Sequence, residues 1–198
     1  MSLKGTTNAE KIWNFLSGKG LTAYGIAGLM GNLYAESGLI PTNLQNSYEK
    51  SLGMNDVEYT AAVDSGKYAN FVHDSAGYGL AQWTYWSRKE ALLNYAKAAG
   101  TSVGDLETQL GFLWKEISGY SAVIKVLKAA TSVREASDVV LLQYERPANQ
   151  GESVQQTRAG YGQKYFDQYA STATVKPAAS GSCTAARLLA IAAAEIGY

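Results

Sequence analysis

Three glycines spaced three residues apart, Gly25, Gly28 and Gly31, are the feature that most constrains how this 198-residue chain can fold. They lie in residues 22–37, where the apolar residues recur with the period of a helix. Each glycine in a helix costs roughly 1 kcal/mol relative to alanine, so three in one helix need compensation. Glycines at this spacing let another backbone come close. The sequence therefore predicts a tightly packed helix that starts near Thr22 and stops at Gly38.

Helical signals recur along most of the remaining chain. The capping box, a hydroxyl followed three residues later by a carboxylate, occurs at Thr7–Glu10 and again at Ser132–Glu135. Only one segment, Lys67–Asp74, has a pattern that could pair briefly as a strand. The predicted fold class is mainly α, a helical domain with a substrate cleft. The other expected helices are 57–64 inside an irregular excursion over 40–80, 84–100, one capped by Ser102 that runs through Ile117, one from Ser132 to Pro147, and 152–170.

The composition changes after residue 170. Residues 171–182 are small, polar and contain a proline, which is typical of a linker. Residues 183–198 form a short Ala-rich helical pattern, and a helix of this length is marginal on its own. We therefore expect one domain over 7–170, a linker, and the truncated start of a second domain.

Charge and residue counts argue against several classes of function. The 17 basic and 17 acidic residues balance, so the chain has no electrostatic footprint for nucleic acid or an anionic membrane. A single cysteine, Cys183, and a single histidine, His73, leave no disulfide within the chain and no Cys- or His-rich metal site. No cofactor and no membrane insertion are expected. The N-terminus lacks the pattern of a secretion signal, so for action outside a cell another route of delivery is expected.

Glu36 is the first candidate catalytic residue. On a helix over 22–37, Leu29, Leu33 and Glu36 fall at i, i+4 and i+7, so this carboxylate extends an apolar face. An arbitrary glutamate there would be paired or solvated at the helix end. Burial and the C-terminal end of the helix dipole both disfavour a charged carboxylate, and a general acid must hold its proton. This arrangement suits cleavage of a glycosidic bond.

The second candidate segment is the glycine-rich stretch "HDSAGYGLAQWT", residues 73–84. Its glycines, Gly79 among them, let a ligand approach the main chain, and the Gln82 amide can grip sugar hydroxyls and N-acetyl groups. Tyr78 and Trp83 either stack on sugar rings or simply pack inside the loop. His73 is expected to be structural.

Several motifs, in the right order, resemble the phage tail lysozyme family of the lysozyme-like superfamily. "AESG" ends a helix, the stretch from Asp74 to Arg88 reads "D-x-x-GYGL-x-QWT-x-x-x-R", and a late "YERP" spans Tyr144 to Pro147. The resemblance covers residues 8–170. It implies a lysozyme-like helical fold, the β-1,4 glycan of bacterial peptidoglycan as substrate, and Glu36 as the catalytic acid. The C-terminal pattern is similar to the opening helix of CHAP-type amidase or endopeptidase domains.

A glycosidase usually needs a second carboxylate, about 5–5.5 Å from the acid for retention or roughly 6.5–9.5 Å for inversion. Asp74 is the best candidate because it opens the loop that carries Gln82, although the alternative, that it caps the loop through nearby backbone N–H groups, is slightly favoured. Asp64, Asp56 and Glu49 are the alternatives. Without a second carboxylate, a lytic transglycosylase remains open, in which one glutamate serves as acid and then as base.

The remaining expectations concern the surroundings of the site. By analogy with related clefts, Tyr144 is expected to hydrogen-bond Glu36, whereas Glu145 and Arg146 are expected to form a structural ion pair. The expected partners are bacterial peptidoglycan and other phage tail or lysin components. The protein is expected to be part of a phage tail or to serve host lysis, and in both cases to act on the bacterial wall. The alternative to an enzyme is a wall-binding or tail-structural module that keeps the cleft but has no turnover.

Overall fold

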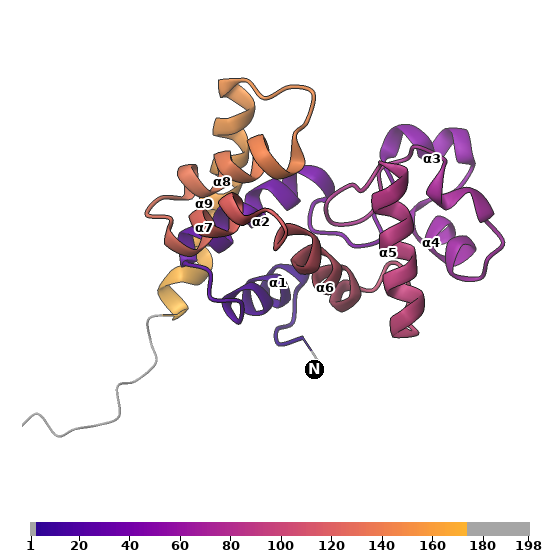
Figure 1. Cartoon of the computed structure of the whole chain (residues 1–198), viewed down its shortest axis with the longest axis horizontal. Helices are drawn as coiled ribbons and strands as arrows, with labels where there is room; N and C mark the ends of the chain where they lie inside the picture. Colours follow the sequence, from indigo (N-terminus) through magenta and orange to yellow (C-terminus); the bar gives the residue numbers. More distant parts are fainter. Residues whose placement is uncertain (1–2, 174–198) are drawn as a thin grey trace, which may run out of the picture.

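The computed structural model describes residues 3–173, with side chains described as far as residue 170, and within this range the chain is mainly helical (Figure 1). The predicted mainly α class is thus confirmed. The helices, in chain order, are α1 Asn8–Ser17, α2 Ala23–Ser37, α3 Asn46–Leu52, α4 Asp56–Asp64, the 3₁₀ turn η1 Ala69–Val72, α5 Trp86–Ala99, α6 Leu106–Ile117, α7 Ser121–Ala129, α8 Val133–Val140, the π-helical turn η2 Leu141–Glu145 and α9 Glu152–Ala173.

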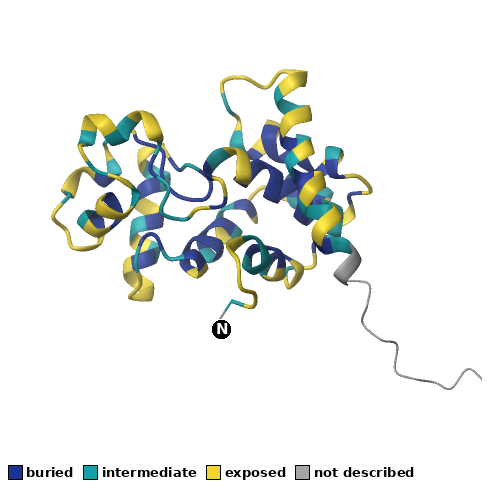
Figure 2. Cartoon of the chain, turned by 180° about the vertical axis from the view of Figure 1, so that it is seen from behind, coloured by how far each residue is buried: buried dark blue, intermediate teal, exposed yellow. Residues whose placement is uncertain are grey.

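Helix α2 is the buried centre of one part of the molecule. Figure 2 shows its buried segments enclosed by helices whose outer faces are exposed. A Cβ added at Gly25 would lie 2.0 Å from the Leu127 carbonyl oxygen, and one at Gly28 would lie 2.5 Å from the Ala136 Cβ. One at Gly31 would lie 2.3 Å from the Arg158 carbonyl oxygen. Each glycine is therefore in close contact with a different helix: α7 at Gly25, α8 at Gly28 and α9 at Gly31. The sequence predicted a close approach by one other backbone, and the structure has three.

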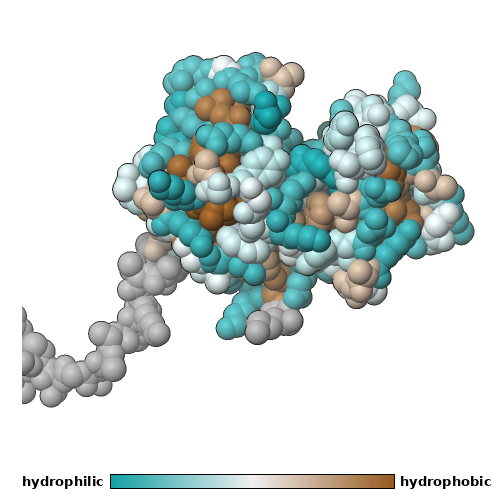
Figure 3. Space-filling model, viewed as in Figure 1, coloured by the Kyte–Doolittle hydropathy of each residue, from teal (hydrophilic) through white to brown (hydrophobic). Residues whose placement is uncertain are grey.

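The other part of the molecule consists of α3, α4, η1 and α5, and Figure 3 shows the surface indented between the two parts. The loop between η1 and α5 lies against α6 and α4. In it, Tyr78 forms isolated bridges with Leu44 and Trp83, and no strand occurs within residues 3–173. The expected brief strand at Lys67–Asp74 is wrong because Ala69–Val72 forms the 3₁₀ turn instead.

The helix ends follow the predicted capping residues in part. Thr7 forms the full capping box with Glu10, and Gly38 closes α2 in the left-handed conformation with φ 63°. The second box is only half formed. Ser132 accepts from the Glu135 backbone N–H, but the Glu135 carboxylate accepts from the Thr131 backbone instead.

Two expected helix ends are wrong. The cap of α6 is Asp105, whose side chain accepts from Thr108 N–H, whereas the Ser102 hydroxyl accepts from Gly104 N–H in the preceding turn. The helix expected to reach Pro147 ends its α-helical part at Val140 and continues as the π turn. Helices α3 and α7 were not predicted.

Helix α9 continues to Ala173, three residues into the expected linker. The remainder of that linker and the expected second-domain helix, residues 183–198, lie outside the described residues. No helix in the described range is long and apolar enough to cross a bilayer.

Candidate functional site

A pocket of about 700 Å³ gathers residues from both parts of the molecule. Glu36 enters it from the last turn of α2, and Glu145 from the end of the π turn. The loop before α5 supplies Gln82, and α5 itself supplies Arg88. The full lining is Glu36, Gln45, Ala81, Gln82, Thr84, Tyr85, Arg88, Glu145, Pro147 and Ala148. Two of the predicted site residues, Glu36 and Gln82, therefore meet in one pocket.

Glu36 is held by an ion pair from α9. The Arg158 guanidinium lies 2.6 Å from its carboxylate, and both side chains are largely buried. Arg158 also donates to the Asn32 side-chain oxygen at 3.2 Å, and the Asn32 amide donates to the Ser137 carbonyl oxygen on α8. This chain of polar contacts ties α9 and α8 to α2 on the side of Glu36. Arg158 belongs to none of the motifs that predicted site residues.

Glu145 is the second carboxyl group in the pocket. Its Oε1 is shielded from solvent and has no hydrogen-bond partner within residues 3–173. Burial raises the pKa of Glu145 to about 8, and the Glu36 charge adds to this rise while Arg88 and Arg158 oppose it. The expected ion pair with Arg146 is wrong, because Glu145 points into the pocket and Arg146 is an exposed residue in the left-handed conformation, φ 50°.

A third carboxylate, Glu116 of α6, binds Arg88, which lines the pocket. It accepts from both Nε and Nη2 of Arg88 at 2.7 Å, from the Tyr144 hydroxyl at 2.5 Å and from Trp83 Nε1 at 3.0 Å. Burial alone would raise the pKa of Glu116, but these hydrogen bonds outweigh it and keep the pKa below its ordinary value. Tyr144 is thus bonded to Glu116, and the expected hydrogen bond to Glu36 is wrong.

The glycine-rich loop presents its amide but not its two aromatic rings. Gln82 has a left-handed backbone, φ 44°, and its Nε2 donates to the side-chain and main-chain oxygens of Asn43. Gly79, also left-handed, is buried against Gln109 and does not line the pocket. Tyr78 is buried and shares a 2.6 Å hydrogen bond with Thr60, as expected of a ring that packs inside the loop.

The exposed aromatic rings follow the loop. Tyr85 is 63% exposed and lines the pocket, and Trp86 next to it is 47% exposed. Their ring centroids are 6.0 Å apart. Among the described residues that line the pocket, Tyr85 is the aromatic one, whereas the predicted Trp83 is fully buried.

Asp74 lies in a buried ion pair away from the pocket lining. It pairs with Lys89, whose side chain is 0% exposed, and accepts from the Tyr59 hydroxyl at 2.5 Å and from Ala76 N–H at 3.0 Å. Burial lowers the pKa of Lys89, although the Asp74 carboxylate opposes this shift. The structure thus gives Asp74 the loop-capping contacts that were the alternative to catalysis.

The other expected carboxylates also lie outside the pocket lining. Asp56 accepts from Leu44 N–H and Asp64 from Val103 N–H, so both cap backbone segments, and Glu49 is part of α3. In the described range, no group of three or more His, Cys, Asp or Glu residues could hold a metal ion.

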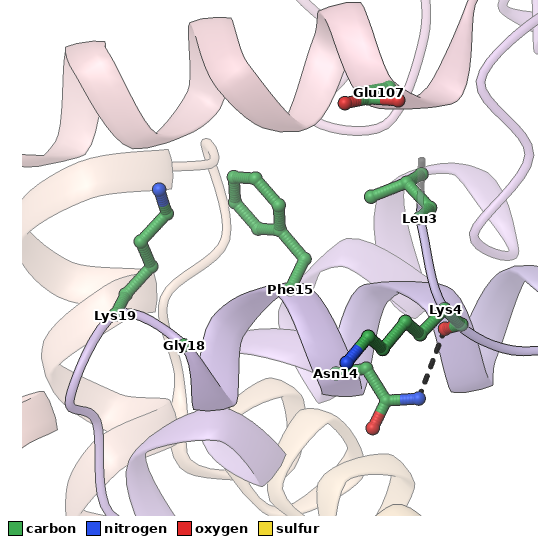
Figure 4. A pocket seen from close by; sticks show the side chains of 7 residues that line it. All are labelled: Leu3, Lys4, Asn14, Phe15, Gly18, Lys19 and Glu107. Carbon is green, nitrogen blue, oxygen red and sulfur yellow. Dashed lines mark hydrogen bonds between the residues drawn. The ribbon is translucent and has the colours of Figure 1, made fainter. Parts of the chain in front are cut away.

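A second pocket, of about 490 Å³, lies between α1 and α6 (Figure 4). Phe15 projects into it from α1 and Lys19 from the turn after α1, and the Lys19 ammonium lies 4.5 Å from the centre of the Phe15 ring. Asn14 donates to the Lys4 carbonyl oxygen at its edge. None of the predicted site residues lines this pocket.

Comparison with known proteins identifies a matching family and a similar protein. A family model described as phage tail lysozyme matches residues 7–169. One similar protein is Morphogenesis protein 1 of Bacillus phage B103, which is 29% identical over 175 residues. The match covers 84% of this chain and 41% of the relative, so the chain spans about two-fifths of that protein's length.

Proposed function

The chain belongs to the phage tail lysozyme family, and on that premise we propose that it is a peptidoglycan glycosidase that uses Glu36 as its catalytic acid. Family membership implies a lysozyme-like role in cell-wall lysis. The observation that supports the finer proposal is that Glu36, at the end of the buried helix α2, reaches an open pocket shared with Gln82 and Tyr85. The proposed substrate is the β-1,4 glycan of the bacterial wall.

In the proposed reaction, Glu36 protonates the glycosidic oxygen as the bond to the sugar carbon breaks. Arg158 fixes the carboxyl group and screens its charge when the proton has left. A general acid in this position contributes about 10²- to 10⁴-fold to the rate. Gln82 and the exposed Tyr85 ring bind the sugar, while Tyr78, Gly79, Trp83 and Tyr144 support the pocket from within.

A hydrolase is favoured over a lytic transglycosylase by one observation. The pocket contains a second carboxyl group, Glu145, although the expected Asp74 is engaged with Lys89. Hydrolysis needs such a group to activate water or to act as nucleophile, whereas a transglycosylase needs only one glutamate. The relative named for morphogenesis supports a role within a phage particle, where other phage proteins would be partners.

The test is digestion of purified Gram-positive peptidoglycan, followed by mass spectrometry of the soluble fragments. Wild-type protein is compared with Glu36→Gln and with Glu90→Gln, an exposed glutamate of α5 outside the pocket. Reducing sugar ends produced by the wild type and by Glu90→Gln, and lost in Glu36→Gln, would support the hydrolase. Ends lighter by one water would identify a transglycosylase.

Two outcomes would contradict the proposal. Equal cleavage by Glu36→Gln would remove Glu36 from the reaction. Binding to the wall without cleavage by any of the three proteins would favour the wall-binding module.

A further inference from the structure

Glu145 carries a feature that a purely structural residue does not explain. Its Oε1 is buried at the pocket and has no hydrogen-bond partner in the described part of the chain. Buried polar atoms are almost always paired, so an unpaired, buried carboxyl oxygen in a residue that lines a pocket calls for an explanation. The expected partner, Arg146, is exposed, and within residues 3–173 no ion pair joins it to Glu145. The hydrogen bonds to Glu116 come from Arg88, Tyr144 and Trp83.

The π turn places Glu145 in this position. Arg146 N–H donates to the Leu141 carbonyl oxygen, five residues back, at 2.8 Å. This widened turn displaces the following side chains from their α-helical directions. As a result Tyr144 meets Glu116 while Glu145 lines the pocket. Isolated π turns occur frequently at functional sites.

Charged groups act on Glu145 from each element that surrounds it. Glu36 on α2 and Glu116 on α6 disfavour a second negative charge, whereas Arg88 on α5 and Arg158 on α9 favour it. Arg88 is already committed to Glu116, and Arg158 to Glu36. The Tyr144 hydroxyl next to it in sequence donates to Glu116. Each of these two cations is thus paired with another carboxylate, and within residues 3–173 neither forms an ion pair with Glu145.

We propose that Glu145 is the second carboxyl of the site, and that Glu36 and Glu145 together hold the single proton that the reaction consumes and recovers. This proposal rests on the proposed function of Glu36. In the resting protein, Glu145 carries the proton and Glu36 is the carboxylate paired with Arg158. Burial and the Glu36 charge, which raise the pKa of Glu145, agree with this distribution.

The proton balance closes over one cycle. The proton passes from Glu145 to Glu36 and then to the glycosidic oxygen, which takes the electron pair of the broken C–O bond. Both groups are then carboxylates, next to Arg88 and Arg158. Water adds its oxygen to the sugar carbon, and Glu145 accepts the proton that this water loses. The site thereby returns to its starting state, with the proton on Glu145.

The test is the pH dependence of kcat/KM for Glu145→Gln, measured with soluble peptidoglycan fragments beside wild type, Glu145→Asp and the surface control Glu90→Gln. Wild-type activity should fall with rising pH near the Glu145 value of about 8, where the pair loses its proton. Glu145→Gln should lose about 100-fold or more at neutral pH. Its alkaline limb should no longer lie at the wild-type position, because the carboxyl that holds the proton has been removed. Glu145→Asp should restore part of the rate and the wild-type limb.

A structural role would lower the rate without moving the limb, and an unmoved limb in Glu145→Gln would overturn the proposal. Infrared titration of the carboxyl C=O band in the wild type provides a second measurement that needs no variant to fold. A protonated carboxyl that persists at neutral pH and disappears near pH 8 is expected, and its absence would also overturn the proposal.

The same experiments separate this inference from the proposed function. If the wild type cleaves and Glu36→Gln does not, but Glu145→Gln behaves as the wild type, only the role of Glu145 fails. If the wild type does not cleave peptidoglycan at all, the glycosidase proposal fails, and the infrared titration still decides whether Glu145 holds a proton.

Discussion

Asp74→Asn separates the structural and catalytic interpretations of the predicted second carboxylate. The substitution preserves the shape of the side chain but removes its charge, opposite a lysine that is completely buried. Lys89 keeps two neutral partners, the Tyr59 hydroxyl at 3.2 Å and the Ala76 carbonyl oxygen at 2.8 Å. Its ammonium would thus remain buried with hydrogen bonds but without a counter-charge.

The expected loss of stability is large. Removing one partner of a buried ion pair costs about 3–5 kcal/mol, and the Asn amide oxygen, which still accepts a hydrogen bond, places the cost near the lower end. In a domain of this size, each kcal/mol corresponds to about 2–4 °C of melting temperature. We therefore expect the melting temperature to fall by roughly 6–12 °C for a loss of about 3 kcal/mol.

Thermal unfolding by circular dichroism measures the stability, and peptidoglycan turnover well below the lowered melting temperature measures catalysis. Asp74→Asn should keep near-wild-type turnover there. Adding Lys89→Met, which removes the buried charge, should recover much of the lost stability. An Asp74→Asn protein with unchanged melting temperature and abolished turnover would refute this reasoning and return Asp74 to the reaction.

Four further outcomes follow from individual contacts. Gly28→Ala should destabilise the fold by about 1–3 kcal/mol in urea unfolding, because its Cβ would meet the Ala136 backbone, whereas Gly160→Ala, with open space around it, should be neutral or stabilising. Glu116→Gln should cost about 2–3 kcal/mol and reduce turnover, since Arg88 and two ring donors lose their charged acceptor; unchanged unfolding would contradict this. Tyr85→Ala should raise KM about 3- to 10-fold with kcat nearly unchanged, as loss of a stacking ring predicts, and an unchanged KM would exclude that contact. Finally, Glu145 binds its proton more tightly when folded, so the free energy of unfolding should fall as pH rises from about 4.5 to about 8, and Glu145→Gln should flatten that decline.

The sequence predicted the helical architecture well where local chemistry determines it. The glycine triplet identified α2 as a closely packed helix, and Thr22 and Gly38 marked its ends. Helix signals were less informative where competing caps lie near one another. Asp105 takes the role expected of Ser102 because its carboxylate reaches the Thr108 N–H. Helix α7 has a strong apolar stripe but an N-terminus without a side-chain cap, so it offered no start signal.

The candidate site was predicted in part, and the errors have one physical origin. Glu36 and Gln82 belong to short motifs that set their local surroundings, and both line the pocket. Tyr78, Trp83 and Asp74 share the motif with Gln82 but point inward. Which face of an irregular loop is buried depends on α4 and α6, which pack against it from distant positions in the sequence. Spacing along the chain cannot supply that information.

Arg158 and Glu145 could be found only from the assembled structure. Arg158 sits on α9 and reaches Glu36 because Gly31 allows α9 to lie directly against α2. Glu145 was visible in the "YERP" motif, but an α-helical register gives the wrong direction for its side chain. The π turn could not be anticipated from the residues around it.

The two buried polar clusters explain how a pocket between two parts of the molecule can keep its geometry. Glu116 binds Trp83 from the loop, Arg88 from α5 and Tyr144 from the π turn, and so fixes three segments that line or adjoin the pocket to α6. Asp74 and Lys89 fix the start of the same loop to α5. Glu116 need not contact substrate to affect catalysis, because it holds Arg88, which lines the pocket, and the π turn that carries Glu145. A change in Glu116 is therefore expected to affect both stability and turnover. A change in Asp74 is expected to affect stability alone, because neither Asp74 nor its partner Lys89 lines the pocket.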